Sequence, residues 1–144
     1  MRKLLLTTFA ILGITGIAYA IETEYSSNYI HRFEVCGAYS ESNQSQIPTG
    51  DKTMPVLHLK TTNSIVGIRG GKCATKVNVY ARELQGNIIT INCRFTKEQR
   101  MDLIKKMESA ATNPVAEQQL KEKLTNYIKN RPDVCTYKNL LEEE

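Results

Sequence analysis

Four cysteines constrain the fold of this 144-residue chain more than any other feature: Cys36, Cys73, Cys93 and Cys135. No two of them form a C-x-x-C pair, so the spacing of a thioredoxin-like redox site or of a zinc ribbon is absent. An even number of cysteines in a small exported chain is typical of a disulfide framework. The sequence therefore predicts two disulfides, provided that the chain leaves the cytoplasm.

The first twenty residues are typical of a secretory signal peptide. Met1 to Lys3 is a basic start, Leu4 to Ile17 is mainly apolar, and Ala18 to Ala20 places small residues where a signal peptidase cleaves. The apolar stretch is too short for a membrane-spanning helix. We therefore predict a signal peptide over residues 1–20 and one periplasmic or extracellular domain over residues 21–144, with no membrane span.

The predicted mature chain is nearly neutral. The whole chain has a formal net charge of +4, and loss of Arg2 and Lys3 leaves 4 − 2, about +2. This balance excludes histone-like binding driven by the charge of the whole chain. Hydrophobic residues make up 41% of the whole chain, which excludes a fully disordered protein.

The N-terminal third of the mature chain divides into two segments. Apolar or aromatic character at alternate positions predicts a strand within residues 21–36. These alternate positions are Tyr29, His31, Phe33 and Val35. Residues 37–53 are polar and contain two glycines and a proline, so we predict a surface loop there. Loops of this length are often functional.

Residues 54–95 are predicted to form an antiparallel meander. Gly70 and Gly71 supply the positive φ angles that a two-residue hairpin turn needs. Counting outward from this turn, the predicted pairs are Arg69 with Lys72, Ile68 with Cys73, and Val66 with Thr75.

A second turn is predicted at Gln85-Gly86-Asn87. A three-residue loop keeps apolar residues on one face, whereas a two-residue loop mixes polar and apolar residues on both faces. The predicted pairs are Leu84 with Ile88, Ala81 with Ile91, Val79 with Cys93, and Val77 with Phe95. The core face of the meander is then Val66, Ile68, Cys73, Val77, Val79, Ile91, Cys93 and Phe95.

Two helices are predicted to follow. Thr96 and Gln99 form a capping box before an apolar stripe of Leu103, Ile104, Met107 and Ala111. Asn113 and Pro114 open the second helix, whose apolar face is Ala116, Leu120, Leu124, Tyr127 and Ile128. Residues 136–144 are predicted to be a frayed tail. The fold class is α+β: a β-meander of four or five strands with two C-terminal helices packed on one face.

The predicted register also limits the disulfide pairing. It separates Cys73 from Cys93 by about 20 Å along the strands, too far for a bond. Two pairings remain, Cys36–Cys73 with Cys93–Cys135, or Cys36–Cys93 with Cys73–Cys135. The shorter sequence separations favour the first pairing, because shorter loops are easier to close.

Catalytic and cofactor motifs are not found. The histidines, His31 and His58, belong to no metal-binding pair, and Gly70-Gly71 is a turn rather than a phosphate loop. His58 lies between Leu57 and Leu59, which indicates a solvent-facing strand position. We predict a protein without catalytic residues, metal or cofactor. An envelope enzyme without a recognisable motif is a weaker alternative.

The register places basic residues on the sheet face opposite the core. It pairs Asn78 with Arg94, Tyr80 with Asn92, and Arg82 with Thr90. The predicted site for an anionic ligand consists of Arg69, Lys72, Lys76, Tyr80, Arg82 and Arg94. Long cations can also serve only to keep an exposed sheet soluble.

An exported protein with such a face is expected to bind an anionic envelope component, such as a lipid headgroup or an acidic glycan, or an acidic protein. Nucleic acid is a weaker candidate, because the face has one aromatic residue and the net charge is small. The alternative is an inhibitor or immunity-type protein that blocks an enzyme with residues 37–53.

Overall fold

The computed structural model describes residues 25–139. Three helices and five strands follow in the order α3 (Ser27–Val35), β1 (Tyr39–Asp51), β2 (Met54–Arg69), β3 (Lys72–Ala81), β4 (Gly86–Phe95), α4 (Lys97–Ala110), α5 (Pro114–Asn130) and β5 (Cys135–Asn139). The predicted signal peptide and the last five residues lie outside the described part of the chain. The prediction of a frayed tail from residue 136 is wrong for residues 136–139, which belong to β5.

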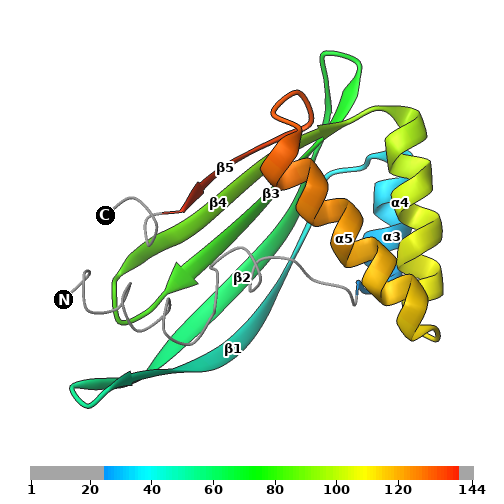
Figure 1. The fold of residues 1–144 in the computed structure, drawn as a ribbon. Coiled ribbons are helices and arrows are strands. Elements are labelled where there is room, and N and C mark those ends of the chain that lie inside the picture. Colours follow the sequence, from blue (N-terminus) through cyan, green and yellow to red (C-terminus); the bar gives the residue numbers. More distant parts are fainter. Residues whose placement is uncertain (1–24, 140–144) are drawn as a thin grey trace.

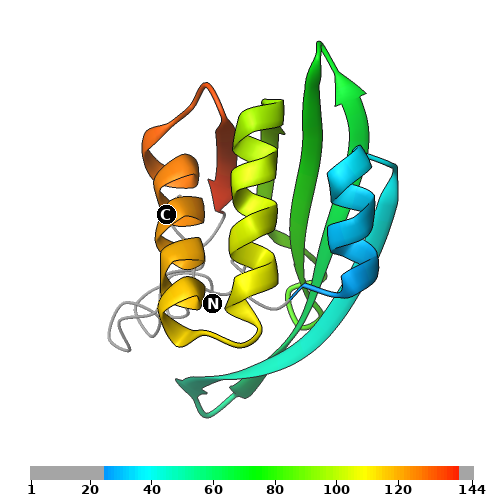
Figure 2. The same cartoon turned by 90° about the vertical axis from the view of Figure 1, so that its right-hand side faces the viewer.

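The strands form one antiparallel sheet in the order β1-β2-β3-β4-β5. The helices lie together on one face and cover one end of it, while β1 to β4 extend beyond them (Figure 1). Figure 2 shows α3, α4 and α5 side by side in front of the sheet. The predicted α+β meander with two C-terminal helices is therefore confirmed, and α3 is an additional helix.

The predicted strand within residues 21–36 is wrong, because this segment contains helix α3. Ser26 caps the helix by accepting a hydrogen bond from the Tyr29 amide at 3.0 Å. Tyr29 and Phe33, one helical turn apart, are buried, whereas Val35 is 66% exposed. The four-residue spacing of the two buried aromatic residues is compatible with either a strand or a helix. The N-cap at Ser26 favours the helix.

The predicted loop over residues 37–53 is also wrong, because Tyr39–Asp51 is the edge strand β1. β1 pairs with β2 from Tyr39, opposite Ile65, to Pro48, opposite Val56. Its polar side chains are mostly exposed, since a strand at the edge of a sheet has one side open to solvent. The segment lacks apolar alternation because little of β1 faces the core.

The first hairpin follows the predicted register only near its turn. Arg69 pairs with Lys72 and Ile68 with Cys73, as predicted, but Ile65 rather than Val66 pairs with Thr75. A bulge lies between Ile65 and Gly67, which has a φ of 124°. Val66 and Ile68 are 39% and 51% exposed, so their assignment to the core is wrong.

The second hairpin differs from the predicted register by four residues from Cys73 to Val79, and by five beyond the bulge between Val79 and Tyr80. Its turn has four residues, 82–85, and Ala81 pairs with Gly86, so the predicted pairing of Leu84 with Ile88 is wrong. The observed pairs are Cys73 with Phe95, Thr75 with Cys93, Val77 with Ile91, and Val79 with Ile89. Because four is an even number, the residues assigned to the core face in β3 and β4 still point to that face. They are all buried except Val77, which is half-buried.

The helices begin as predicted. The Thr96 hydroxyl accepts a hydrogen bond from the Gln99 amide, and the Gln99 side chain accepts one from the Thr96 amide. The apolar stripe of α4 contains Leu103, Ile104 and Met107 as predicted, but its last member is Ala110 rather than the exposed Ala111. The predicted apolar face of α5 is buried in full.

An aromatic cluster joins the sheet to helices α3 and α5. The ring of Phe95 on β4 lies between Phe33 of α3, with a centroid distance of 5.9 Å, and Tyr127 of α5, at 5.8 Å. All three side chains are buried. Such aromatic pairs contribute about 0.5–1.5 kcal/mol each beyond their buried area.

Two disulfides connect the elements, and the favoured pairing is confirmed. Cys36 after α3 is bonded to Cys73 at the start of β3, and Cys93 on β4 is bonded to Cys135 on β5. The separation of about 20 Å predicted between Cys73 and Cys93 is wrong. Their ladder partners, Phe95 and Thr75, place the two cysteines only two positions apart on neighbouring strands.

Candidate binding site on the outer sheet face

The sheet has an outward side, opposite the helices, whose side chains form rows because paired residues in an antiparallel sheet point the same way. We call the four rows the outer face. From β1 to β5 the first row is Ser40, Ser64, Lys76, Asn92 and Thr136, and the second is Ser42, Thr62, Asn78, Thr90 and Lys138. The third row is Gln44, Lys60, Tyr80 and Asn87, and the fourth is Gln46 and His58.

Hydrogen bonds between neighbouring side chains order the outer face. The hydroxyls of Ser40 and Ser64 lie 3.0 Å apart, and those of Ser42 and Thr62 lie 2.9 Å apart. On the other side of the second row, the Thr90 hydroxyl donates to the Asn78 amide oxygen at 3.1 Å. The outer face is therefore a regular surface of hydroxyl and amide groups.

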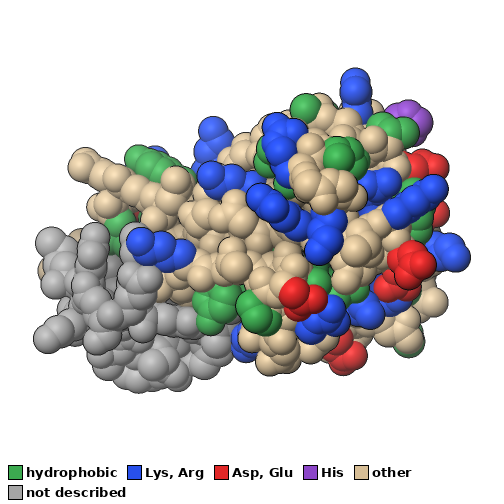
Figure 3. All heavy atoms as spheres, turned by 90° about the horizontal axis from the view of Figure 1, so that it is seen from above, with side chains coloured by type: hydrophobic (Ala, Val, Ile, Leu, Met, Phe, Trp, Pro, Cys, Tyr) green, Lys and Arg blue, Asp and Glu red, His purple; other side chains and the backbone are tan. Residues whose placement is uncertain are grey.

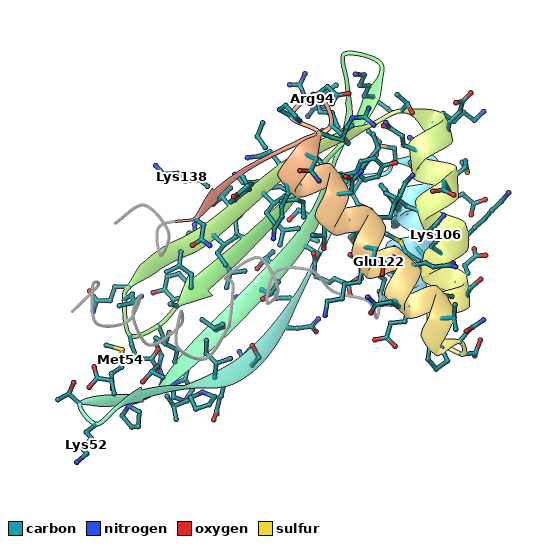
Figure 4. The ribbon with its side chains drawn as sticks, viewed as in Figure 1. Lys52, Met54, Arg94, Lys106, Glu122 and Lys138 are labelled. Carbon is teal, nitrogen blue, oxygen red and sulfur yellow. A yellow bond between two sulfur atoms is a disulfide. The ribbon has the colours of Figure 1, made fainter. Side chains whose placement is uncertain are left out.

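The charge of the outer face has one sign. The rows contain three lysines, Lys60, Lys76 and Lys138, and no Asp or Glu. Lys138 extends away from the helices (Figure 4). Seen from above, Lys and Arg side chains are spread over the described surface, and the visible acidic side chains lie toward the helices (Figure 3).

The structure spreads the residues of the predicted basic site along the sheet. Three of them lie near the β2–β3 turn. Arg69 and Lys72 flank the β2–β3 turn, and Arg94 on β4 lies close to that turn, since its guanidinium is 4.0 Å from the position of a Cβ on Gly70. Tyr80 lies at the other end of β3, about 26 Å from Lys72. The other two predicted residues are Lys76, midway along β3, and Arg82, in the β3–β4 turn.

The predicted pairings within this basic site are wrong. Asn78 pairs with Thr90 rather than Arg94, and Tyr80 pairs with Asn87 rather than Asn92. Arg82 does not pair with Thr90, because it lies in the turn. Its amide instead donates to the His58 carbonyl at 3.0 Å.

A pocket of about 290 Å³ opens on the outer face around Tyr80. We call it the Tyr80 pocket. It is lined by Gln44, Ser45, Gln46, His58, Leu59, Lys60, Tyr80 and Arg82. Strands β1, β2 and β3 and the β3–β4 turn thus bring two amides, two cations, an imidazole and a phenol ring together.

Glu83 fixes the histidine of this pocket. Its carboxylate accepts two hydrogen bonds from the His58 backbone amide, at 3.1 and 3.0 Å, and also contacts His58 Nδ1. Burial raises the pKa of Glu83, but the hydrogen bonds from the side chain and backbone of His58 outweigh it and hold that pKa below its ordinary value. The Arg82 guanidinium also contacts His58 Nδ1, at 3.1 Å from Nη2, so Glu83 and Arg82 both hold this side of the ring and Nε2 is left for another partner.

The sequence predicts only Tyr80 and Arg82 of this pocket. The structure adds the polar side chains of Gln44, Gln46, His58 and Lys60. The glutamines belong to residues 37–53, for which the sequence predicts a loop rather than a strand. The signal for the other two was present, since His58 and Lys60 alternate with Leu57 and Leu59 and so point outward.

Two further features bear on function. Among residues 25–139, no group of three or more His, Cys, Asp or Glu side chains is placed to hold a metal ion. In the same part of the chain, no helix is long and apolar enough to cross a membrane.

Comparisons of the chain with protein-family models, with curated proteins and with solved structures give no match. The function therefore has to be inferred from the chemistry of the outer face.

Proposed function

We propose that this protein is exported to the periplasm or the extracellular space and binds an anionic ligand on its outer sheet face, without catalysing a reaction. The observation that carries the proposal is the composition of the rows, which contain three lysines and no acidic residue. The two disulfides support an oxidising compartment, and so does the N-terminal sequence.

The physical argument concerns the local field. The net charge of the whole chain is small. A face with lysines and no acidic residues nevertheless produces a positive potential, which raises the local concentration of an anionic partner. The hydroxyl and amide groups between the lysines add directional hydrogen bonds. The positive potential attracts the ligand to the outer face, and hydrogen bonds from the polar side chains of the rows then bind it.

The alternative of an inhibitor acting through residues 37–53 has less support. An inhibitory loop needs to project from the body of the protein, and this segment forms strand β1 in the sheet. A membrane surface or an acidic protein would be expected to use the β2–β3 turn, where Arg69 and Lys72 lie beside the exposed side chains of Val66 and Ile68.

The test compares two triple variants of equal charge. The first replaces Lys60, Lys76 and Lys138 of the outer face by Gln, and the control replaces Lys105, Lys121 and Lys129, which are exposed on the helices. We expect only the first to elute from heparin at lower salt, since both lose the same net charge. Equal elution of the two variants would contradict the proposal.

A further inference from the structure

We infer that the Tyr80 pocket binds the terminal acidic sugar of a glycan, with the ring carboxylate as its anionic group. The inference rests on the proposed function, because the rest of the glycan would lie along the rows of the outer face. It adds the class of ligand and the direction in which the ligand lies: the end of the glycan that carries the acidic sugar binds at the third and fourth rows.

The size of the Tyr80 pocket fits one ring. Its volume of about 290 Å³ lies at the small end of ligand pockets, which span about 300–1,000 Å³. The pocket is open on the outer face, so the remainder of a longer ligand can leave it without a gate. A single terminal unit fits these dimensions, and the interior of a polymer does not need such a recess.

The groups around the pocket match an acidic sugar. Tyr80 is 40% exposed and offers an aromatic ring to the apolar face of a pyranose. The amides of Gln44 and Gln46 each have donors and acceptors for ring hydroxyls. Lys60 and Arg82 supply positive charge for a carboxylate.

His58 adds a hydrogen-bonding group of defined direction. With Nδ1 held by Glu83, its Nε2 has no partner among the described residues. Nε2 can therefore form a hydrogen bond with a sugar hydroxyl, which is able both to donate and to accept. Glu83 positions this group, because its carboxylate also binds the His58 backbone and so fixes the ring.

The surroundings of the pocket disfavour the other anionic ligands. A phospholipid needs an extended apolar surface for its chains, and the four rows offer one large hydrophobic side chain, Tyr80, with the pair Pro48 and Val56 beyond the fourth row. A nucleic acid strand needs successive aromatic platforms for its bases, and the rows again offer one. Rows of hydroxyl, amide and lysine groups suit the hydroxyls and carboxylates of a glycan.

The experiment measures binding of a tetrasaccharide ending in glucuronic acid, and of the same tetrasaccharide with that carboxylate reduced to an alcohol, by calorimetry at fixed salt. We expect wild type to prefer the acidic probe about tenfold or more, because the carboxylate meets two cations. Tyr80→Phe keeps the ring and should retain binding, while Tyr80→Ala should lose about tenfold.

A second pair of variants distinguishes binding by the Tyr80 pocket from attraction by the net charge of the protein. Gln44→Ala should weaken the acidic probe by about 3- to 10-fold through a lost hydrogen bond. The helix variant with Lys105, Lys121 and Lys129 replaced by Gln should bind it as wild type does. Thermal unfolding of each variant checks that the fold is retained.

Three outcomes overturn the inference: equal affinity for the two tetrasaccharides, wild-type affinity in Tyr80→Ala, or no binding of the acidic tetrasaccharide while heparin, anionic vesicles or single-stranded DNA still bind. The last outcome leaves the proposed function standing. If neither the tetrasaccharide nor any anionic polymer or surface binds, the proposed function fails with it.

Discussion

Glu83 binds His58 at two places, because its carboxylate accepts hydrogen bonds from the backbone amide of His58 and contacts Nδ1 of its ring. These contacts connect the β3–β4 turn to the first third of β2, 25 residues earlier in the chain. Glu83 itself is mostly buried beside Arg82, whose guanidinium lies 3.9 Å from the carboxylate. The Glu83 side chain thus positions His58 in the wall of the Tyr80 pocket and connects the β3–β4 turn to β2.

Replacement of Glu83 by Gln should lower stability in a pH-dependent way. The pKa of Glu83 in the fold is below its ordinary value near 4.5, so the ionised group stabilises the fold above that pH. This contribution is lost as the pH falls through the lowered pKa. We expect Glu83→Gln to reduce the free energy of unfolding by about 1–3 kcal/mol at pH 7, and by much less at pH 2 to 3.

Urea unfolding of the two proteins at both pH values measures the difference. Glu98→Gln, on the first turn of α4, is a control for the loss of one carboxylate. A difference between wild type and Glu83→Gln that is equally large at acid and neutral pH would contradict the role of the ionised carboxylate.

The two disulfides should stabilise different parts of the fold. Cys93 and Cys135 pair directly across β4 and β5, with Cα atoms 4.1 Å apart, whereas Cys36 and Cys73 connect α3 to β3. Their sequence separations, 42 and 37 residues, are nearly equal, so each should contribute about 4 kcal/mol by chain entropy. Replacing either pair by Ala should therefore lower global stability similarly.

Hydrogen exchange should distinguish the two double variants. Loss of Cys93–Cys135 should release the amides of the five-residue strand β5, and loss of Cys36–Cys73 should release those of α3. Each variant serves as the control for the other. Identical patterns of lost protection would show that the bridges act only through the unfolded state.

A buried amide in the core predicts a stabilising substitution. Asn63 is 2% exposed, and its Nδ2 has no hydrogen-bond partner among residues 25–139. It borders a cavity of about 40 Å³ between the sheet and the helices. An unsatisfied buried donor costs about 1–3 kcal/mol, so Asn63→Leu, which keeps the branched shape, should raise the melting temperature. A lower melting temperature would instead indicate that a water molecule in the cavity binds this amide.

Much of the fold could be predicted from local signals. The capping box at Thr96 and the Asn113-Pro114 start specify the two C-terminal helices, because these residues satisfy free backbone amides whatever the tertiary context. The Gly70-Gly71 turn was predicted for a similar reason, since few residues adopt its positive φ angles. These elements can be predicted because a few neighbouring residues specify each of them.

The errors arose where tertiary contacts decide. Helix α3 depends on Phe33 packing against Phe95, 62 positions later, and β1 depends on a ladder with β2 that its own polar sequence does not indicate. The second hairpin was displaced by four residues, but the face of each side chain depends only on even or odd displacement. For this reason Asn78 of β3 and Arg94 of β4 share a side, as predicted, although they do not pair with each other.

The last prediction tests how α3 is held on the sheet. Phe33 is 1% exposed and packs edge-on against Phe95 at 5.9 Å, so Phe33→Ala removes the main apolar contact of α3 with β4. Such truncations cost about 3–5 kcal/mol, whereas Phe33→Leu retains most of the volume and should cost clearly less. Val35→Ala, two positions away and exposed, should leave the free energy of unfolding unchanged within about 0.5 kcal/mol. Because Cys36–Cys73 still anchors the end of α3, the Ala variant should stay folded, and circular dichroism with urea titration would measure these differences. Equal costs for Phe33→Ala and Val35→Ala would mean that the disulfide alone holds the helix.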